Sequence, residues 1–331
     1  MLRLIQLTGR SGGRVGVVTG DSIELLSTNR TIYGLAMLSL SRGASLKDCA
    51  VSQLSGEMVD YNAVYAGHGD WQVGLPIDHP DDPARVLVSG TGLTHMASVK
   101  NRDAMHSSAQ NVTDSVKMYQ LGLAGGRPEA GRVGTSPEWF YKGNGSVLKA
   151  HNQPLSIPFF AEDGGEEPEI AGVYVIDNAG NPRRIGFCQG NEFSDHLFEK
   201  RNYLYLASSK LRECAIGPEL IVDGDFHHVK GEVSVFRKGE TLWSQPIQTG
   251  EEVMCHSLAN MEHHHFKFPG HRRPGDVHVH YYGADAFSFG AGILLQDGDW
   301  MQVSFDGFGR PLRNPVQKDE VSEAPVTVTA L

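Results

Sequence analysis

Cysteine is scarce in this sequence, and long hydrophobic runs are missing from it. The four cysteines are scattered without a Cys-x-x-Cys pair, which argues against a disulfide framework and against a thiolate zinc site. No stretch approaches the roughly 18 uninterrupted apolar residues of a membrane span. Polar residues close to Met1 interrupt the apolar region that a signal peptide needs. We therefore expect a cytoplasmic protein that has no membrane partner.

Basic residues are also fewer than acidic residues in this sequence. The chain has 29 Lys and Arg against 39 Asp and Glu, which gives a formal charge of −10, and no dense basic face is apparent. A protein that binds nucleic acid usually presents a basic patch to the phosphate groups. The sequence therefore predicts no nucleic-acid partner.

Glycine and proline are plentiful, with 39 and 16 residues, and short β-branched runs lie between them. This pattern is typical of a mostly β protein of the α+β class. Residues 2–7, 14–18 and 22–26 predict short strands, and the apolar spacing in residues 32–42 predicts a helix. Residues 75–83 are polar and proline-rich, as in a linker. We therefore expect a small N-terminal α+β domain, residues 1–84, and a larger domain, residues 85–331.

A pair of glutamates precedes the most strongly apolar stretch of the chain. Glu167 and Glu169 stand at the head of residues 168–176, which predict a buried strand, and alternation places both carboxylates on one face. Turn residues at 177–182 and a second run at 183–190 predict a hairpin. A two-residue loop at Gly180-Asn181 would pair position 169 with Glu192. A slip of one residue would send Glu192 to the other face.

Three carboxylates that converge in a sheet need a cation to offset their repulsion and their loss of solvent. Oxygen ligands suit Mg²⁺, with Mn²⁺ or Ca²⁺ as alternatives, better than they suit zinc. The competing interpretation is that these glutamates are ordinary strand-end residues that face solvent.

Several segments resemble, in the same order along the chain, the motifs of one enzyme family. They are Pro137–Lys142, Glu167–Glu169, Gly186–Glu192, Ser209-Lys210, Gly217–Val222, Pro274–Val277, Leu295–Asp299 and Phe308–Val316. From about residue 85 to residue 316, the sequence resembles the fumarylacetoacetate hydrolase superfamily. The agreement of many motifs in order is more specific than any single motif.

The resemblance implies a catalytic domain with a rolled β-sheet, a homodimer, and a small-molecule 2-keto acid as substrate. It implies that Glu167, Glu169 and Glu192 hold Mg²⁺, which acts as a Lewis acid on the keto acid. Lys210 would neutralise enolate charge or shuttle a proton, and Lys142 lies in a matching motif. His95 is the counterpart of a histidine that activates water in the family.

Four further residues are candidates for substrate binding. Gly92 belongs to a glycine pair that lets the backbone come close to a ligand, and Arg102 has the helical spacing to reach a substrate carboxylate. Tyr282 and Gly283 stand where the family often has Gly-Thr-Pro.

Departures from the family pattern bear on the reaction. Ser98 stands where hydrolytic relatives usually carry a glutamate three residues after the histidine. We therefore favour a lyase that dehydrates a 2-keto-3-deoxy sugar acid, pentonate-like, as in a bacterial branch linked with sugar-acid catabolism. The alternatives are a hydrolase or decarboxylase that cleaves a C–C bond of a 3-acylpyruvate or diketo acid, and a non-catalytic sugar-acid-binding protein.

The C-terminal third is rich in histidine. His278 and His280 share a face of a predicted strand, which is compatible with zinc. The run His263-His264-His265 cannot point in one direction, however, and the usual Glu general-base motif on a helix is absent. The glutamates remain the stronger metal-site hypothesis.

Overall fold

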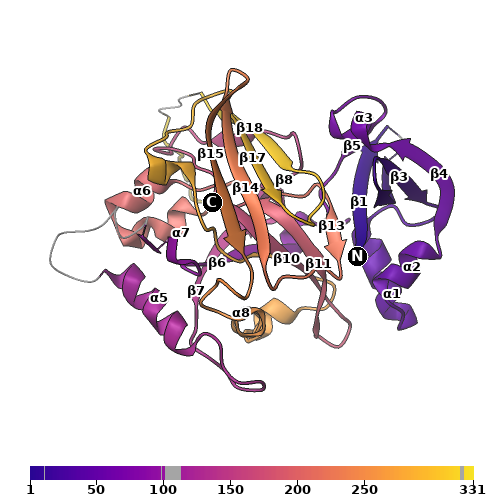
Figure 1. Ribbon diagram of the computed structural model, residues 1–331, viewed down its shortest axis with the longest axis horizontal. Coiled ribbons are helices and arrows are strands. Elements are labelled where there is room, and N and C mark those ends of the chain that lie inside the picture. The colour runs from indigo at the N-terminus through magenta and orange to yellow at the C-terminus, as the bar shows by residue number, and fades with distance from the viewer. Residues whose placement is uncertain (11, 98, 101–112, 321–323) are drawn as a thin grey trace.

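The computed structural model describes residues 1–331 except 11, 98, 101–112 and 321–323 (Figure 1). Within the described residues, the strands form a large sheet of thirteen strands and a smaller one of five. The expectation of a mostly β, α+β fold is confirmed. None of the described helices is both long and apolar enough to cross a membrane.

The main path of the large sheet runs through ten strands. In spatial order they are β4 (Leu54–Asp60), β3 (Ser22–Leu26), β2 (Gly12–Thr19), β1 (Leu2–Gly9), β13 (Leu220–Val222), β11 (Pro182–Asn191), β10 (Pro168–Ile176), β16 (Val277–Tyr281), β6 (Val86–Gly92) and β7 (Glu138–Asn144). Three short strands attach beside this path: β5 (Trp71–Val73), β8 (Leu148–Lys149) and β12 (Cys214–Ile216).

The smaller sheet packs against the middle of the large one. Its order is β15 (Glu240–Thr249), β14 (Val229–Arg237), β17 (Trp300–Phe305), β18 (Leu312–Lys318) and β9 (Leu155–Ile157). In Figure 1, β14, β15 and β17 lie in front of β10 and β11. Ile170 and Phe187 of the large sheet share a hydrophobic cluster with Val233 and Val303 of the small one. The strands that carry the candidate glutamates are therefore covered, and every residue of β10 is buried.

Helices lie around these sheets. The α-helices are α1 (Ile32–Arg42), α2 (Leu46–Val51), α3 (Tyr61–Tyr65), α5 (Asp114–Gly125), α6 (His196–Arg201), α7 (Leu206–Ser209) and α8 (Leu258–Phe266). Short 3₁₀ turns occupy Pro83–Arg85, Gly145–Val147, Tyr203–Tyr205, Pro269–Arg272 and Ser288–Ala291. The predicted helix at 32–42 is α1, which begins after the cap Thr31, whose hydroxyl accepts from the Gly34 N–H.

Strands on both sides of the predicted domain boundary at residue 84 belong to one sheet. β1 pairs with β13 in antiparallel register, with Leu2 opposite Val222. The Arg3 guanidinium also forms an ion pair with the buried Glu219, at 2.5 Å. The division into residues 1–84 and 85–331 stays a prediction.

The hairpin of β10 and β11 exists, but its predicted register is wrong by two residues. Glu169 pairs with Gly190, and the backbone N–H of Glu192 donates to the Glu167 carbonyl at 2.9 Å. The loop has five residues, 177–181, because the Asp177 carboxylate accepts from the backbone N–H groups of residues 179 and 181. A bulge after Val173 adds one residue to β11. A shift of two keeps Glu192 on the predicted face.

Candidate metal centre

Glu167, Glu169 and Glu192 come together at the end of the β10–β11 hairpin. One carboxylate oxygen from each lies within 4.8 Å of the others, and all three side chains are buried. Glu169 lies in β10, whereas Glu167 directly precedes that strand and Glu192 directly follows β11. The alternative that these residues face solvent is therefore wrong, because the neighbouring elements cover them.

Two buried lysines supply positive charge to this cluster. The Lys210 amine donates to Glu167 Oε1 and to Glu192 Oε2, both at 2.7 Å, and to the Ser194 hydroxyl at 2.9 Å. The Lys142 amine lies 2.5 Å from Glu192 Oε1 and donates to the Phe193 carbonyl at 2.7 Å. The two predicted lysines therefore lie at the glutamate cluster.

The carboxylates still outnumber the lysines. Burial, followed by the charges of Glu192 and Glu167, raises the pKa of Glu169 well above its usual range. Burial also raises the pKa of Glu192, to about 7, against the opposing effects of Lys142 and Lys210. The Gly283 backbone N–H donates to Glu169 Oε2 at 2.6 Å, yet a neutral donor does not balance a charge. A hard divalent cation among these oxygens fits the excess negative charge and the ligand chemistry.

His196 also belongs to this site, and sequence reasoning missed that role. Its Nε2 lies 2.9 Å from Glu167 Oε1, and its ring stacks on Phe287 with centroids 4.7 Å apart. Burial lowers its pKa, but the hydrogen bond and charge of Glu167 outweigh burial and raise it. The available signal was its place four residues after Glu192, at the start of α6, whose N-cap Asp195 accepts from the Phe198 N–H.

A small cavity opens beside the glutamates. It is lined by Gly92, Leu93, Phe140, Glu167, Glu169, His196, Glu199, Lys210, Gly283, Ala284 and Phe287. The predicted residues Gly92 and Gly283 therefore face the same space as Lys210. Gly283 has a φ of +97°, and a Cβ there would meet the Thr94 hydroxyl at 2.0 Å, so this position requires glycine.

Two other predicted residues do not line the cavity. His95 is buried, with Nδ1 2.9 Å from the Thr94 hydroxyl and Nε2 3.1 Å from the Thr249 hydroxyl, and burial lowers its pKa to about 3. The Tyr282 carbonyl accepts from Thr94 at 2.8 Å, and its hydroxyl contacts the Tyr174 hydroxyl. Their catalytic and binding roles stay predictions. Arg102 and Ser98 lie outside the described residues.

Comparison with known proteins identifies relatives that share the fold of this chain. No known protein-family profile matches the sequence. A probable 2-keto-3-deoxyxylonate dehydratase of Haloferax volcanii is 24% identical over 307 residues, which cover 88% of this chain and 94% of that protein. A solved 2-keto-3-deoxy-D-arabinonate dehydratase, complexed with magnesium and 2,5-dioxopentanoate, matches with a TM-score of 0.69 at 19% identity, over 96% of this chain and 99% of the other. The chain has the fold of this dehydratase.

A more distant solved structure shares the architecture. The 2-hydroxyhepta-2,4-diene-1,7-dioate isomerase of Mycobacterium marinum matches with a TM-score of 0.58 at 15% identity, over 96% of this chain and 99% of that one. For the fold, the resemblance to the fumarylacetoacetate hydrolase superfamily is confirmed.

The histidine cluster is a packed part of the interior rather than a second metal site. His265 Nε2 lies 2.9 Å from His278 Nδ1, and the two ring nitrogens of His280 contact the hydroxyls of Ser89 and Thr91 at 2.8 and 2.7 Å. Among the described residues, the three glutamates are the one group of at least three candidate ligands that converges closely enough for a metal.

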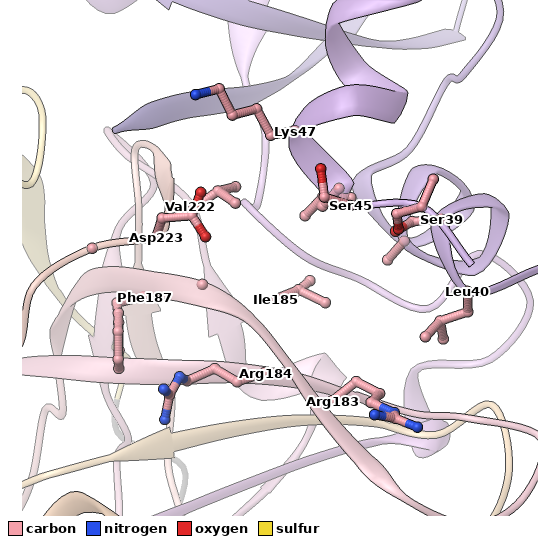
Figure 2. Close-up of a pocket in the computed structure, with 15 residues that line it drawn as sticks. Ser39, Leu40, Ser45, Lys47, Arg183, Arg184, Ile185, Phe187, Val222 and Asp223 are labelled. Atoms are coloured by element: carbon pink, nitrogen blue, oxygen red, sulfur yellow. The ribbon is translucent and has the colours of Figure 1, made fainter. Parts of the chain in front are cut away.

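A second cavity, of about 320 Å³, lies between α1, α2 and β11 (Figure 2). Arg183 forms an ion pair with Asp177 at 2.8 Å, and Arg184 forms one with Glu262. Figure 2 shows the charged ends of Lys47, Arg183 and Arg184 spread apart around this space. Because these cations do not converge, the cavity offers no counterpart to the glutamate cluster.

Proposed function

We propose that this protein is a Mg²⁺-dependent hydro-lyase that dehydrates a 2-keto-3-deoxy sugar acid of the pentonate class. The observation that carries the proposal is the buried cluster of Glu167, Glu169 and Glu192 beside two lysines. The support from outside the chain is the fold shared with a dehydratase solved with magnesium and 2,5-dioxopentanoate, and the similarity to the Haloferax relative.

The donor set fits a hard divalent cation, Mg²⁺ first and Mn²⁺ or Ca²⁺ as alternatives, held by the three glutamates. Bound Mg²⁺ would supply a Lewis acid that stabilises negative charge on the keto oxygen of the substrate. Lys210 and His196 both contact Oε1 of Glu167, so they orient this carboxylate and leave Oε2 for the ion.

Dehydration begins with the loss of a proton from the carbon next to the keto group. Negative charge then develops on the substrate, and the hydroxyl on the following carbon leaves with one proton, as water. The new carbon–carbon double bond then shifts toward the terminal carbon, which loses a proton while the carbon next to the keto group gains one, and the resulting enol becomes the aldehyde of 2,5-dioxopentanoate. Lys210 lies on the cavity, where its ammonium offsets this developing charge without needing to move. Lys142 fixes the Glu192 carboxylate from the side away from Lys210, because it contacts the other oxygen.

The walls of the cavity suit an elimination that excludes bulk water. Phe140, Leu93 and Phe287 line it, and it holds free space of only about 20 Å³, enough for one or two waters. The competing hydrolytic reaction needs an activated water in the site. His95, the candidate for that task, bonds to threonine hydroxyls outside the lining, so the geometry favours dehydration.

We also propose that the protein is a cytoplasmic homodimer. All four cysteines are buried and unpaired, which suits a reducing compartment. The dimer follows from the family resemblance, and light scattering coupled to size exclusion measures it directly.

The proposed reaction is tested by comparing substrates. With Mg²⁺ present, we expect release of 2,5-dioxopentanoate from 2-keto-3-deoxypentonate and no turnover of an acylpyruvate. Turnover of the acylpyruvate alone would support the C–C hydrolase instead. Binding of the sugar acid without any turnover would indicate a sensor protein.

A further inference from the structure

The segment Gly283–Phe287 forms one wall of the cavity, and neighbouring glutamates hold it at Gly283 and at the next residue, Ser288. At one end, the Gly283 N–H donates to Glu169 at 2.6 Å. At the other end, the Ser288 N–H and hydroxyl donate to the two oxygens of Glu166, at 2.6 and 2.8 Å. The backbone of this wall is therefore fixed to the same stretch of chain that carries the proposed metal ligands.

Glu166 is fully buried, and it does not belong to the group of three converging glutamates. Both of its oxygens are used by Ser288, so its function is to hold the wall rather than to bind an ion. Ser288 is itself fully buried, and Ala284 and Ala286 are nearly so. Moving this backbone away from the cavity would leave a buried carboxylate without donors, which is costly.

Of the large non-polar side chains in the lining, Phe140 and Leu93 are held by packing. The Phe140 ring lies over Gly90, where a Cβ would approach it to 2.4 Å, and Lys210 lies 4.9 Å from the ring centre. Leu93 belongs to a hydrophobic cluster with Val99 and Tyr119. Neither side chain is free to turn out of the cavity without disturbing a strand or a core.

Phe287 differs from both in its place in the chain. It is buried, but it lies outside the strands, directly before the 3₁₀ turn Ser288–Ala291, and its ring stacks on His196. The cavity holds about 20 Å³ of free space, so a bound acid must displace a lining side chain. Rotation of the Phe287 side chain enlarges the cavity while its backbone stays where Glu166 and Glu169 hold it.

We infer that Phe287 is a specificity-determining residue that limits the length of the 2-keto acid chain. This inference rests on the proposed function for the class of substrate. Each further carbon beyond a five-carbon acid requires a larger displacement of the ring from His196. The wall therefore selects short acids over longer ones.

The test compares Phe287→Ala with Phe289→Ala. Phe289 also lies against His196, with ring centroids 5.1 Å apart, but it does not line the cavity, so it is a matched control. Rates are measured for 2-keto-3-deoxypentonate and 2-keto-3-deoxyhexonate. We expect the ratio of kcat/KM for the six-carbon acid to that for the five-carbon acid to rise about 10- to 100-fold in Phe287→Ala, and to stay constant in Phe289→Ala.

A binding measurement keeps the inference separate from the reaction. In the presence of Mg²⁺, calorimetry gives the Kd of 2-oxopentanoate and of the longer 2-oxoheptanoate. Phe287→Ala should strengthen binding of the longer acid relative to the shorter one. A folded Phe287→Ala with unchanged ratios in both assays would overturn the inference. A wild-type protein that dehydrates neither sugar acid would refute the proposed function, while the binding ratios would still decide the role of Phe287.

Discussion

Glu169 is the residue on which the need for a cation is clearest. Glu167 and Glu192 each contact a lysine amine, whereas the contact described for Glu169 is to a backbone N–H. Burial and repulsion by the two neighbouring carboxylates therefore destabilise the charged form of Glu169 more than nearby positive charge stabilises it. The site is incomplete, in electrostatic terms, without a further positive charge.

The first prediction follows from replacing Glu169 by glutamine, which keeps the acceptor for Gly283 and removes the charge. The metal-free variant should melt at a temperature equal to or above that of the wild type, because a repelled buried charge is gone. Its Mg²⁺ affinity should fall by more than the ~10- to 100-fold that loss of an outer-shell partner costs. Melting curves with and without Mg²⁺ measure both effects.

Glu57→Gln is the control for this prediction, since Glu57 pairs with Arg14 at the surface. It should leave the Mg²⁺-induced rise in melting temperature intact. A rise of wild-type size in Glu169→Gln would show that Glu169 does not bind the ion.

The second prediction concerns Lys210, which is buried against Glu167 and Glu192. Lys210→Met leaves two buried carboxylates with less compensation, so the free energy of unfolding of the metal-free protein should fall by about 3–5 kcal/mol. Dehydratase activity should be lost with it. Urea unfolding in EDTA measures the stability.

Lys149→Met provides the comparison, because Lys149 pairs with Glu213 at 2.7 Å in a partly exposed position. That change should cost no more than about 1 kcal/mol. Equal losses for the two variants would contradict the account of Lys210.

At the residue scale, the sequence predicted which glutamates and lysines lie at the site, but it did not predict the contacts of the neighbouring histidines. Glu167 and Glu169 follow from strand alternation, which is a local property. The contact of His196 with Glu167 depends on how α6 leaves the end of β11, and no local pattern encodes that angle. For the same reason the sequence did not predict that His95 would bond to Thr249, far along the chain.

At the scale of elements, the β10–β11 hairpin shows why the pairing register of two strands is harder to predict than the presence of the strands. The apolar runs and turn residues identify both strands. The register instead depends on the Asp177 side chain, which closes a five-residue loop, and on a bulge in the strand pair. Both are side-chain or packing effects. Glu192 still reaches the site because the error of two residues preserves the face.

β6, β16 and α8 meet at the histidine cluster, which gives the fold a defined acid sensitivity. Burial, with smaller contributions from neighbouring histidines, lowers the pKa of His278 and His280 to about 3. The rings of His265 and His271 pack against this pair, and His265 is also held neutral by burial. His265, His278 and His280 are therefore neutral in the folded protein at pH values where the unfolded chain binds protons.

The third prediction is therefore a loss of stability in acid. Stability from His280 is fully present above its unfolded pKa of about 6.5 and is lost as the pH falls toward 3, by about 2 kcal/mol at pH 5. His280→Gln should reduce the drop in unfolding free energy between pH 7 and pH 5 by that amount. Urea unfolding of the metal-free proteins at both pH values tests this, and an equal drop in the variant would contradict it.

At the scale of the molecule, Glu219 joins the first strands to the rest. It is fully buried and accepts from Arg3, from the Tyr61 hydroxyl at 2.7 Å and from the Arg310 N–H at 3.1 Å. The pairing of β1 with β13 crosses the same junction. Local sequence patterns predicted the strands in residues 2–26, but they could not predict this long-range pairing.

The fourth prediction is that Glu219→Gln lowers the free energy of unfolding by about 1–3 kcal/mol, because charged hydrogen bonds are lost. Mg²⁺ affinity should not change, since Glu219 does not line the glutamate cavity. Urea unfolding and calorimetry measure the two quantities. Weaker Mg²⁺ binding would show that the junction and the site are coupled.

The central claim is that Glu167, Glu169 and Glu192 together hold one hard divalent ion. The most direct measurement is an anomalous difference map from crystals grown with Mn²⁺. The account predicts one strong peak about 2.0–2.6 Å from an oxygen of each glutamate, which weakens or vanishes in Glu169→Gln crystals. A map at saturating Mn²⁺ that has no peak among these carboxylates, or has its peak at the histidines, would contradict it.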